Sequence, residues 1–258
     1  METHSRSLFR ILGIVLAWVF MVGINALANI LLFGGVNTGE MSARYPSMFT
    51  PAGFTFAIWS VIYLGLLFYV VVQALPRFRS DPAVVKADGW FGLNAVLNAA
   101  WIVAWHYGWL WLTMLLMLAL LWTLVRMYAV FQDAPRDSIL FAAAFRIPIS
   151  IYLAWICMAT LANISILQSA WGWNDALISA EAWTLGKLLV AVAVGSFVYR
   201  GWRDAAFVAV LAWAAYGIAS NQPDGSLVGM VAGGISLIGV TTILLQGALR
   251  FRTQSQTT

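Results

Sequence analysis

The sequence predicts an all-α fold, a polytopic bundle of transmembrane helices. Of its 258 residues, 62% are hydrophobic and only 9% are charged, and the mean hydropathy is +0.85. This composition leaves too little polar surface for a water-soluble domain. The apolar runs are about 20 residues long and lack the alternation of a barrel strand. Because a backbone inside a bilayer must pair its own polar groups, we expect these runs to be helices.

Eight apolar segments follow one another along the chain, and the seventh is the shortest. In order, they are 8–33, 54–75, 90–106, 110–131, 139–167, 181–199, 205–220 and 227–249. The single cysteine, Cys157, lies inside an apolar run, and no Cys/His cluster indicates a metal site.

The basic residues divide unequally between the two sides that eight spans create. Eleven of the fourteen Lys and Arg fall on the side of the termini, Arg44 falls on the other side, and Arg146 and Lys187 lie within spans. By the positive-inside rule, both termini are expected in the cytoplasm, which an even number of spans satisfies. We therefore expect an integral protein of the cell (inner) membrane.

The first segment has an alternative interpretation as a cleaved signal peptide. Arg6 and Arg10 precede the apolar run, and residues 26–28 form an A-x-A cleavage site. The run continues to Phe33, which is too long for the hydrophobic region of a signal peptide. This length favours a transmembrane helix.

Three stretches place aromatic and amide side chains on shared helical faces. In the first, a loop that contains Pro46 and Pro51 leads into a helix where Phe56, Trp59 and Tyr63 recur at spacings of three and four. Two later stretches follow the same pattern, with Asn94, Asn98, Trp101 and Trp105 in one and Tyr152, Trp155, Ala159 and Asn163 in the other.

These stretches resemble the translocator protein or tryptophan-rich sensory protein family (TspO/MBR). The loop and second helix of that family read roughly PxWxPPxxxFxxxWxxxY, and its third and fifth helices carry NxxW and YLAWxxxATxxN. The residues here that match these patterns are Pro46, Pro51, Trp59, Tyr63, Asn98, Trp101 and the whole of 152–163. The departures are Met48 and Thr50 in the loop, Thr55 near the start of the second helix and Ile151 before the fifth-helix motif, and they bear on the ligand contacts of the loop, not on the fold.

The resemblance covers about residues 8–167 and implies a five-helix translocator-protein-like core, residues 1–168. Residues 169–258 then add about three further transmembrane helices and a short tail. In the family, the corresponding positions line a cavity for porphyrins and for sterol-like or synthetic ligands. The resulting candidate ligand-binding residues are Asn25, Pro51, Phe56, Trp59, Tyr63, Asn98, Trp101, Trp105, Tyr152, Trp155, Ala159 and Asn163.

Depth along the helices brings the Trp and Asn residues of these stretches into one layer, in the outer half of the bilayer. Aromatic walls with a few hydrogen-bonding groups suit a flat, largely apolar ligand. The alternative is that Trp and Asn only pack and hydrogen-bond neighbouring helices. The long connection 34–53 lies over this layer, and its length favours a lid, although a passive connector is a close alternative.

Charged and small residues outside the motifs have simpler interpretations. Arg146 and Lys187 lie near span ends, so snorkelling to the nearer surface is favoured over a functional role. Glycines in the last three helices, Gly239 among them, favour close helix packing or a homodimer face over a second active site.

The leading hypothesis is a membrane protein that binds a planar hydrophobic ligand, a porphyrin, haem or sterol-like molecule, for sensing or transport. No cofactor is expected to be required. The expected partners are membrane lipid and a hydrophobic small molecule, with a homodimer as a further option and no nucleic acid. The alternatives are a light-dependent porphyrin-degrading enzyme, which the resemblance suggests, and a scaffold without a ligand. The spans lack a Ser/His/Asp set, paired carboxylates and a phosphate loop, so hydrolytic and nucleotide chemistry have little support.

Overall fold

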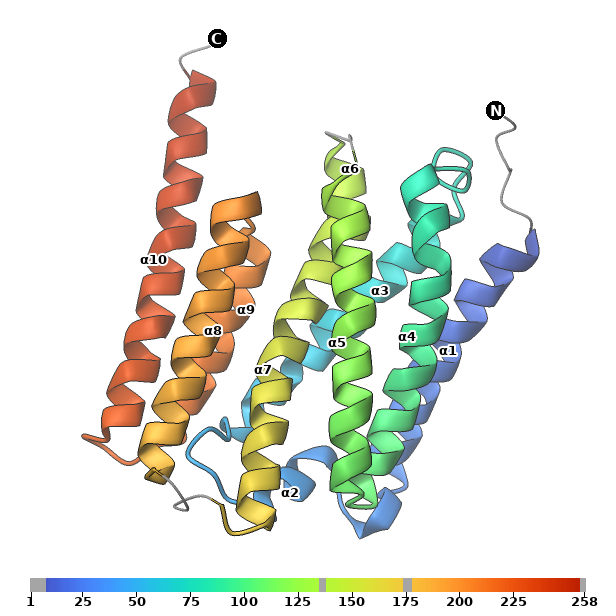
Figure 1. Cartoon of the computed structure of the whole chain (residues 1–258). Helices are drawn as coiled ribbons and strands as arrows, with labels where there is room; N and C mark the ends of the chain where they lie inside the picture. The colour runs from blue at the N-terminus through green and yellow to red at the C-terminus, as the bar shows by residue number, and fades with distance from the viewer. Residues whose placement is uncertain (1–7, 135–137, 174–177, 256–258) are drawn as a thin grey trace.

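The computed structural model describes residues 8–134, 138–173 and 178–255, and within these ranges the chain forms helices and no strand. Eight long helices make a single bundle (Figure 1). The elements in order are α1 (Leu8–Ile30), η1 (Phe33–Gly35), α2 (Thr38–Ala43), η2 (Gly53–Ala57), α3 (Ile58–Gln73), α4 (Pro82–His106), α5 (Leu110–Gln132), α6 (Ile139–Phe141), η3 (Ala142–Arg146), α7 (Ile147–Ala170), α8 (Ala180–Trp202), α9 (Ala205–Ala219) and α10 (Leu227–Ser255).

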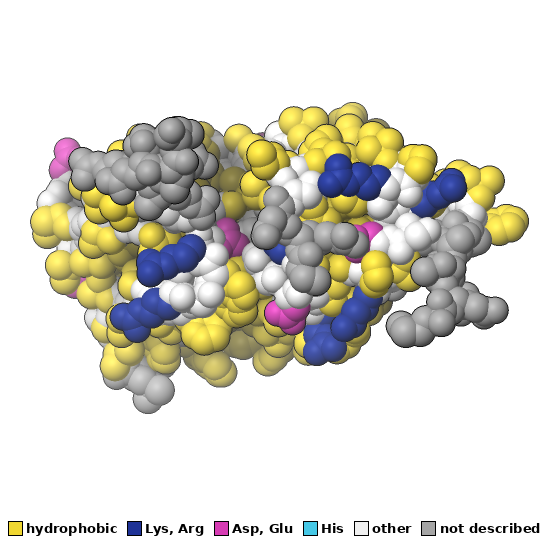
Figure 2. All heavy atoms as spheres, turned by 90° about the horizontal axis from the view of Figure 1, so that it is seen from above, with side chains coloured by type: hydrophobic (Ala, Val, Ile, Leu, Met, Phe, Trp, Pro, Cys, Tyr) yellow, Lys and Arg dark blue, Asp and Glu magenta, His cyan; other side chains and the backbone are white. Residues whose placement is uncertain are grey.

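Successive long helices run in opposite directions, and both ends of the chain lie at the same end of the bundle (Figure 1). Lys and Arg side chains gather on this end (Figure 2). Its connections carry Arg77, Arg79 and Arg203, whereas Arg44 follows α2 at the opposite end. The predicted arrangement of helices and charges is therefore confirmed for the part of the chain that the structure describes. Arg6, Arg136 and the last residues of the tail lie outside it.

Six helical stretches among the described residues are long and apolar enough to cross a membrane. The two predicted spans not among them are α4, which carries Lys86, Asp88 and several Asn, and α9, which has 15 residues. Along the chain, each of them lies between two spans that do qualify. Asn94 and Asn98 of α4 are buried and hydrogen-bonded to neighbouring helices, whereas Lys86 near its start is exposed.

Two helix boundaries differ from the predicted ones for reasons of local chemistry. The third helix was expected to begin at Trp90 but begins at Pro82, because the Asp81 side chain accepts hydrogen bonds from the backbone N–H groups of Ala83 and Val84. A capping Asp followed by Pro at the first helical position is a strong start signal, which hydropathy alone does not register. The predicted fifth segment is one continuous helix from Ile139 to Ala170 with a π-helical turn at Ala142–Arg146.

The long connection between α1 and α3 is folded, not open. It contains α2, where the side chain of Asn37 accepts from the backbone of Glu40 and the side chain of Glu40 accepts from the backbone N–H of Asn37. This reciprocal cap satisfies two otherwise unpaired donors at the helix start. Met41 and Phe49 are each only 1% exposed, so the connection is packed onto the bundle.

The last helices pack closely through small residues, as predicted. A Cβ atom added at Gly195 would meet the side chain of Leu211, and one added at Gly239 would lie 2.9 Å from the Cβ of Ala212. These two glycines let α8 and α10 approach α9, which in turn packs on α7. The C-terminal helices are thus continuous with the core of the bundle.

Candidate ligand-binding cavity

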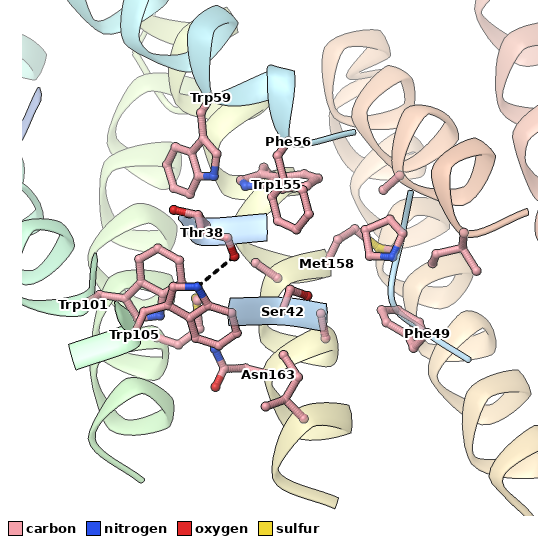
Figure 3. Close-up of a pocket in the computed structure, with 17 residues that line it drawn as sticks. Thr38, Ser42, Phe49, Phe56, Trp59, Trp101, Trp105, Trp155, Met158 and Asn163 are labelled. Carbon is pink, nitrogen blue, oxygen red and sulfur yellow. Dashed lines mark hydrogen bonds between the residues drawn. The ribbon is translucent and has the colours of Figure 1, made fainter. Parts of the chain in front are cut away.

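A cavity lies at the end of the bundle opposite the termini, beneath the connection between α1 and α3 (Figure 3). Five long helices, α3, α4, α5, α7 and α9, and the connection contribute to its wall. The lining residues are Thr38, Ser42, Phe49, Pro51, Phe56, Trp59, Trp101, Trp105, Met117, Trp155, Met158, Ala159, Ala162, Asn163, Ile166, Ala214 and Ile218. Eight of the twelve candidate residues therefore surround one space: Pro51, Phe56, Trp59, Trp101, Trp105, Trp155, Ala159 and Asn163.

Aromatic rings in mutual contact form one side of this cavity. The centroid of the Trp59 ring lies 6.1 Å from that of Trp101 and 6.4 Å from that of Trp155. Trp101 stacks on Trp105 at 5.8 Å, and Phe56 meets the edge of Trp155 at 6.1 Å. The helical spacing i, i+4, i+8 places Trp155, Ala159 and Asn163 on the cavity side of α7, as the sequence pattern predicts.

Two of the indoles hold polar groups without a partner. The Nε1–H donors of Trp101 and Trp155 are buried and have no hydrogen-bond acceptor among the described residues. The neighbouring Trp105 differs, because its Nε1–H donates to the backbone oxygen of Thr38 over 3.2 Å. A buried donor without an acceptor costs about 1–3 kcal/mol. Both residues line the cavity, so an acceptor atom of a bound ligand that reaches either N–H group would satisfy it.

The four remaining candidates form a layer deeper in the bundle and do not line the cavity. Asn25 Nδ2 donates to Asn98 Oδ1 over 2.7 Å, and Asn98 Nδ2 donates to the Tyr152 hydroxyl oxygen over 2.6 Å. Tyr63 stacks on Trp59 with centroids 5.6 Å apart, and Tyr152 meets the edge of the same indole at 5.9 Å. This layer joins α1, α4 and α7 and supports Trp59 from below. Asn25 also shows that α1 is an integral part of the bundle.

The connection over the cavity is held by groups from distant parts of the chain. Ser169 at the end of α7 donates to Pro46 O over 3.1 Å. From the connection between α9 and α10, Gln222 donates to Met48 O over 2.9 Å, and Asn221 donates to Thr50 O over 3.0 Å. Further along, the Trp213 indole donates to Thr55 O over 3.0 Å.

A second set of contacts fixes the start of the same connection to α4. The ring of His106 lies 3.2 Å from Phe33 O through Nδ1 and 3.1 Å from Thr38 Oγ1 through Nε2. Gly34 lies so close to α4 that an added Cβ would meet the backbone oxygen of His106, and its φ of +65° also favours glycine. The connection is thus a closed cover anchored at both ends.

The cavity is small in this closed arrangement, with a volume of about 50 Å³. This volume holds a few water molecules. Pockets for drug-sized ligands measure about 300–1,000 Å³. A flat ligand therefore needs the cover and some of the aromatic rings to move before it can enter.

The model of the TSPO-like protein family matches residues 10–245. This match spans most of the chain. The chain belongs to the TSPO-like protein family. No curated protein and no solved structure matched it. Together with the six apolar helices, membership identifies the chain as an integral membrane protein.

The TSPO-like family match extends well beyond the sequence motifs, which end near residue 167. It includes α8, α9 and most of α10. The cavity is consistent with a family match that includes the last helices, since Ala214 and Ile218 of α9 contribute to its wall. The last helices of this TSPO-like protein are therefore part of the structure that surrounds the cavity and holds its cover.

Several lining residues of this TSPO-like protein were not among the predicted ones. The capping pair Asn37 and Glu40 is a sequence signal for α2, and it would have indicated Thr38 and Ser42, one helical turn apart. Met117, Ala214 and Ile218 carry no such signal, because nothing in an apolar stretch tells a cavity wall from a packed face.

The two charged residues within spans behave differently from each other. Arg146 donates to the backbone oxygens of Phe131 and Ala134 at the end of α5, which fits its predicted role as an anchor. The prediction for Lys187 was wrong. It is only 8% exposed, and its ammonium group donates to Ser165 and Gln168 of α7 and does not extend to the surface. The two side chains of α7 supply the acceptors that keep it inside.

Proposed function

We propose that this TSPO-like protein binds a planar, largely apolar ligand of the tetrapyrrole or sterol-like class in the aromatic cavity, for sensing or transport. The observation that carries the proposal is the pair of unpartnered indole donors, Trp101 and Trp155, in a wall of stacked rings. A flat ring system stacks on such a wall, and an acceptor on the ligand pairs with a buried N–H group.

The small closed volume makes cover movement part of the proposal. The hydrogen bonds that hold residues 46–55 come mainly from exposed side chains such as Asn221 and Gln222, whose individual net contribution is about 1 kcal/mol. Opening this part of the cover also exposes Phe49, but it requires no transmembrane helix to unfold. The ligand enters when these bonds break, and they form again over it.

We also propose that the cavity faces the outside of the cell and that both termini are cytoplasmic. The basis is the concentration of Arg and Lys at the end with the termini (Figure 2) and the positive-inside rule. In a Cys157→Ser background, Ser80→Cys lies in the exposed connection at the charged end and Ala43→Cys at the opposite end. We expect a membrane-impermeant thiol reagent to label only Ala43→Cys in intact cells. Labelling of Ser80→Cys alone would reverse the orientation.

The direct test of function is a titration of the detergent-purified protein with protoporphyrin, haem and a sterol, followed by tryptophan fluorescence. Rings placed between the indoles should quench their emission, and a neutral sterol should compete for the same site. We expect saturable binding of at least one of these ligands at one molecule per chain. Unsaturable, detergent-like quenching by all three would contradict the proposal and leave the aromatic layer as packing.

A further inference from the structure

A second cavity, of about 330 Å³, lies against the first, on the other side of the connection that covers both. Within that connection, Phe49 and Pro51 line the first cavity, and residues 46–48 line the second. The lining residues of the second cavity are Pro46, Ser47, Met48, Ser165, Gln168, Ala180, Trp183, Thr184, Lys187, Asn221, Gln222 and Pro223. The C-terminal part of α7 also borders both spaces, with Asn163 and Ile166 on one side and Ser165 and Gln168 on the other.

This shared wall has a consequence for ligand size. The segment between the two spaces is the same cover whose backbone is held by Asn221, Gln222 and Ser169. If this segment moved to admit a ligand, the aromatic cavity and the second cavity would become parts of one space. A ligand with an apolar ring system and a polar arm then has a place for each.

Lys187 gives the second cavity its charge. Its ammonium group has three N–H donors, and the structure provides two neutral acceptors, Ser165 Oγ at 2.6 Å and Gln168 Oε1. Among the described residues, no carboxylate contacts it. Burial of an ammonium without a counter-charge is costly, and a bound anion lowers that cost.

Trp183 provides a second donor in the same cavity. It precedes Lys187 by four residues, so the two side chains share one face of α8. Its Nε1–H is buried and has no acceptor among the described residues. A carboxylate has two oxygens that accept hydrogen bonds, so a single group can pair with both the ammonium and the indole.

We propose that Lys187 and Trp183 bind a carboxylate of the ligand whose apolar body occupies the aromatic cavity. This inference rests on the proposed function and narrows it, because it assigns the site to anionic amphipathic ligands over neutral ones. Charge-assisted hydrogen bonds are about twice as strong as neutral ones, which makes the acid the preferred form. The polar cavity on α8 then acts as the selectivity site of the protein.

The experiment compares protoporphyrin with its dimethyl ester, which has the same ring system without free carboxylates. Both are titrated against the full-length protein by tryptophan fluorescence. We expect wild type to bind the acid about tenfold more tightly than the ester. Lys187→Met should remove this preference and leave the affinity for the ester unchanged, whereas Lys187→Arg should retain most of it.

Two further variants separate the loss of carboxylate binding from general changes in the structure or charge of the protein. Lys86→Met removes an exposed lysine at the opposite end of the bundle and should leave both affinities unchanged. Trp183→Phe removes the indole N–H and keeps the ammonium, so we expect the preference for the acid to fall several-fold. Thermal unfolding in detergent shows whether Lys187→Met is folded. If it is not, Trp183→Phe still tests the site.

The outcomes distinguish this inference from the function on which it rests. If neither compound binds to wild type, the proposed function fails for tetrapyrroles and the carboxylate site fails with it. If both bind equally well and the Lys187 and Trp183 variants change neither, the aromatic site stands and the carboxylate site is wrong. An equal loss of both affinities in well-folded Lys187→Met also contradicts it, because the lysine then only supports the shape of the site.

Discussion

The two ends of the bundle are both rich in buried aromatic rings, and at the end opposite the termini such rings line a cavity. Near the termini, Tyr69 lies 4.9 Å from Phe91 and 5.1 Å from Phe145, and Phe141 lies 5.1 Å from Phe145, measured between ring centroids. These rings fill the space between the helices. At the covered end, most of the rings around the cavity are indoles. The N–H groups of two of them, Trp101 and Trp155, have no acceptor among the described residues.

The comparison teaches that aromatic content alone does not indicate a ligand site. Phe side chains need only contacts, so a cluster of them is complete when it is packed. Trp side chains also carry a donor, which remains unsatisfied unless the protein or a ligand provides an acceptor. The predictions below use this difference, from the largest expected effect to the smallest.

Phe145→Ala should cause the largest loss of stability. The side chain is fully buried and meets the rings of Tyr69, Phe78, Phe131 and Phe141. Its removal leaves a cavity and deletes contacts on every side, so we expect the free energy of unfolding to fall by about 3–5 kcal/mol. Chemical unfolding in detergent measures this change. A loss below that of Trp155→Ala would contradict the view that the end near the termini is the packed one.

Asp204→Ala should have the next largest effect on stability. Its carboxylate accepts from Ser150 Oγ over 2.7 Å, from the Tyr128 hydroxyl over 2.9 Å and from the backbone N–H of Phe207 over 3.0 Å. These bonds join α5, α7 and the start of α9. Loss of the cap and of the shared acceptor should cost about 2–3 kcal/mol.

The matched variant Asp204→Asn keeps an acceptor for the cap and should cost less than Asp204→Ala. Neither should alter ligand affinity, because Asp204 caps the start of α9, whereas the α9 residues that line the cavity, Ala214 and Ile218, lie near its end. A selective loss of binding in either variant would show that the two ends are not independent.

The fold was largely predictable from the sequence, whereas the site was predictable only in part. Hydropathy identified all eight helices, since each buried or lipid-facing segment is apolar over most of its length. The Trp and Asn spacings identified the rings around the cavity, because i, i+4 positions share a helical face. Local caps at Asp81 and Asn37 were overlooked, although their residues are visible in the sequence.

The environment of Lys187 could not be predicted from the sequence, for a different reason. Its depth within a span suggested an extended side chain, but its direction depends on Ser165 and Gln168 of another helix. The residues of α9 that line the cavity were equally hidden, because tertiary packing alone decides which face of an apolar helix meets a space. Sequence patterns thus locate helices and faces, but not the partners of a single buried charge.

Removal of the tethers on the cover should have a smaller and local effect. Asn221→Ala and Gln222→Ala together delete the hydrogen bonds to Thr50 O and Met48 O. We expect the net stability to fall by only about 1–2 kcal/mol, with faster amide exchange confined to residues 46–55. Hydrogen exchange with mass spectrometry measures both. Addition of ligand should slow exchange there and leave the connection at 74–81 unchanged.

Gln246→Ala is the matched control for the tethers. It removes a comparable bond from a side chain to the Arg203 backbone oxygen near the termini. It should not change exchange in the cover. If it accelerates exchange there as much as the double variant does, the cover is not an independent unit.

The measurement that tests the account most directly is the affinity for protoporphyrin after truncation of one wall of the cavity. Trp155→Ala and Trp59→Ala each remove a ring that borders it, and Trp122→Ala removes a 53% exposed indole that packs on Trp90 outside it. We predict that the first two weaken binding by about 1–3 kcal/mol, or about 5- to 150-fold, and that the third leaves it unchanged. Unchanged affinity in well-folded Trp155→Ala and Trp59→Ala would contradict the claim that these rings hold the ligand.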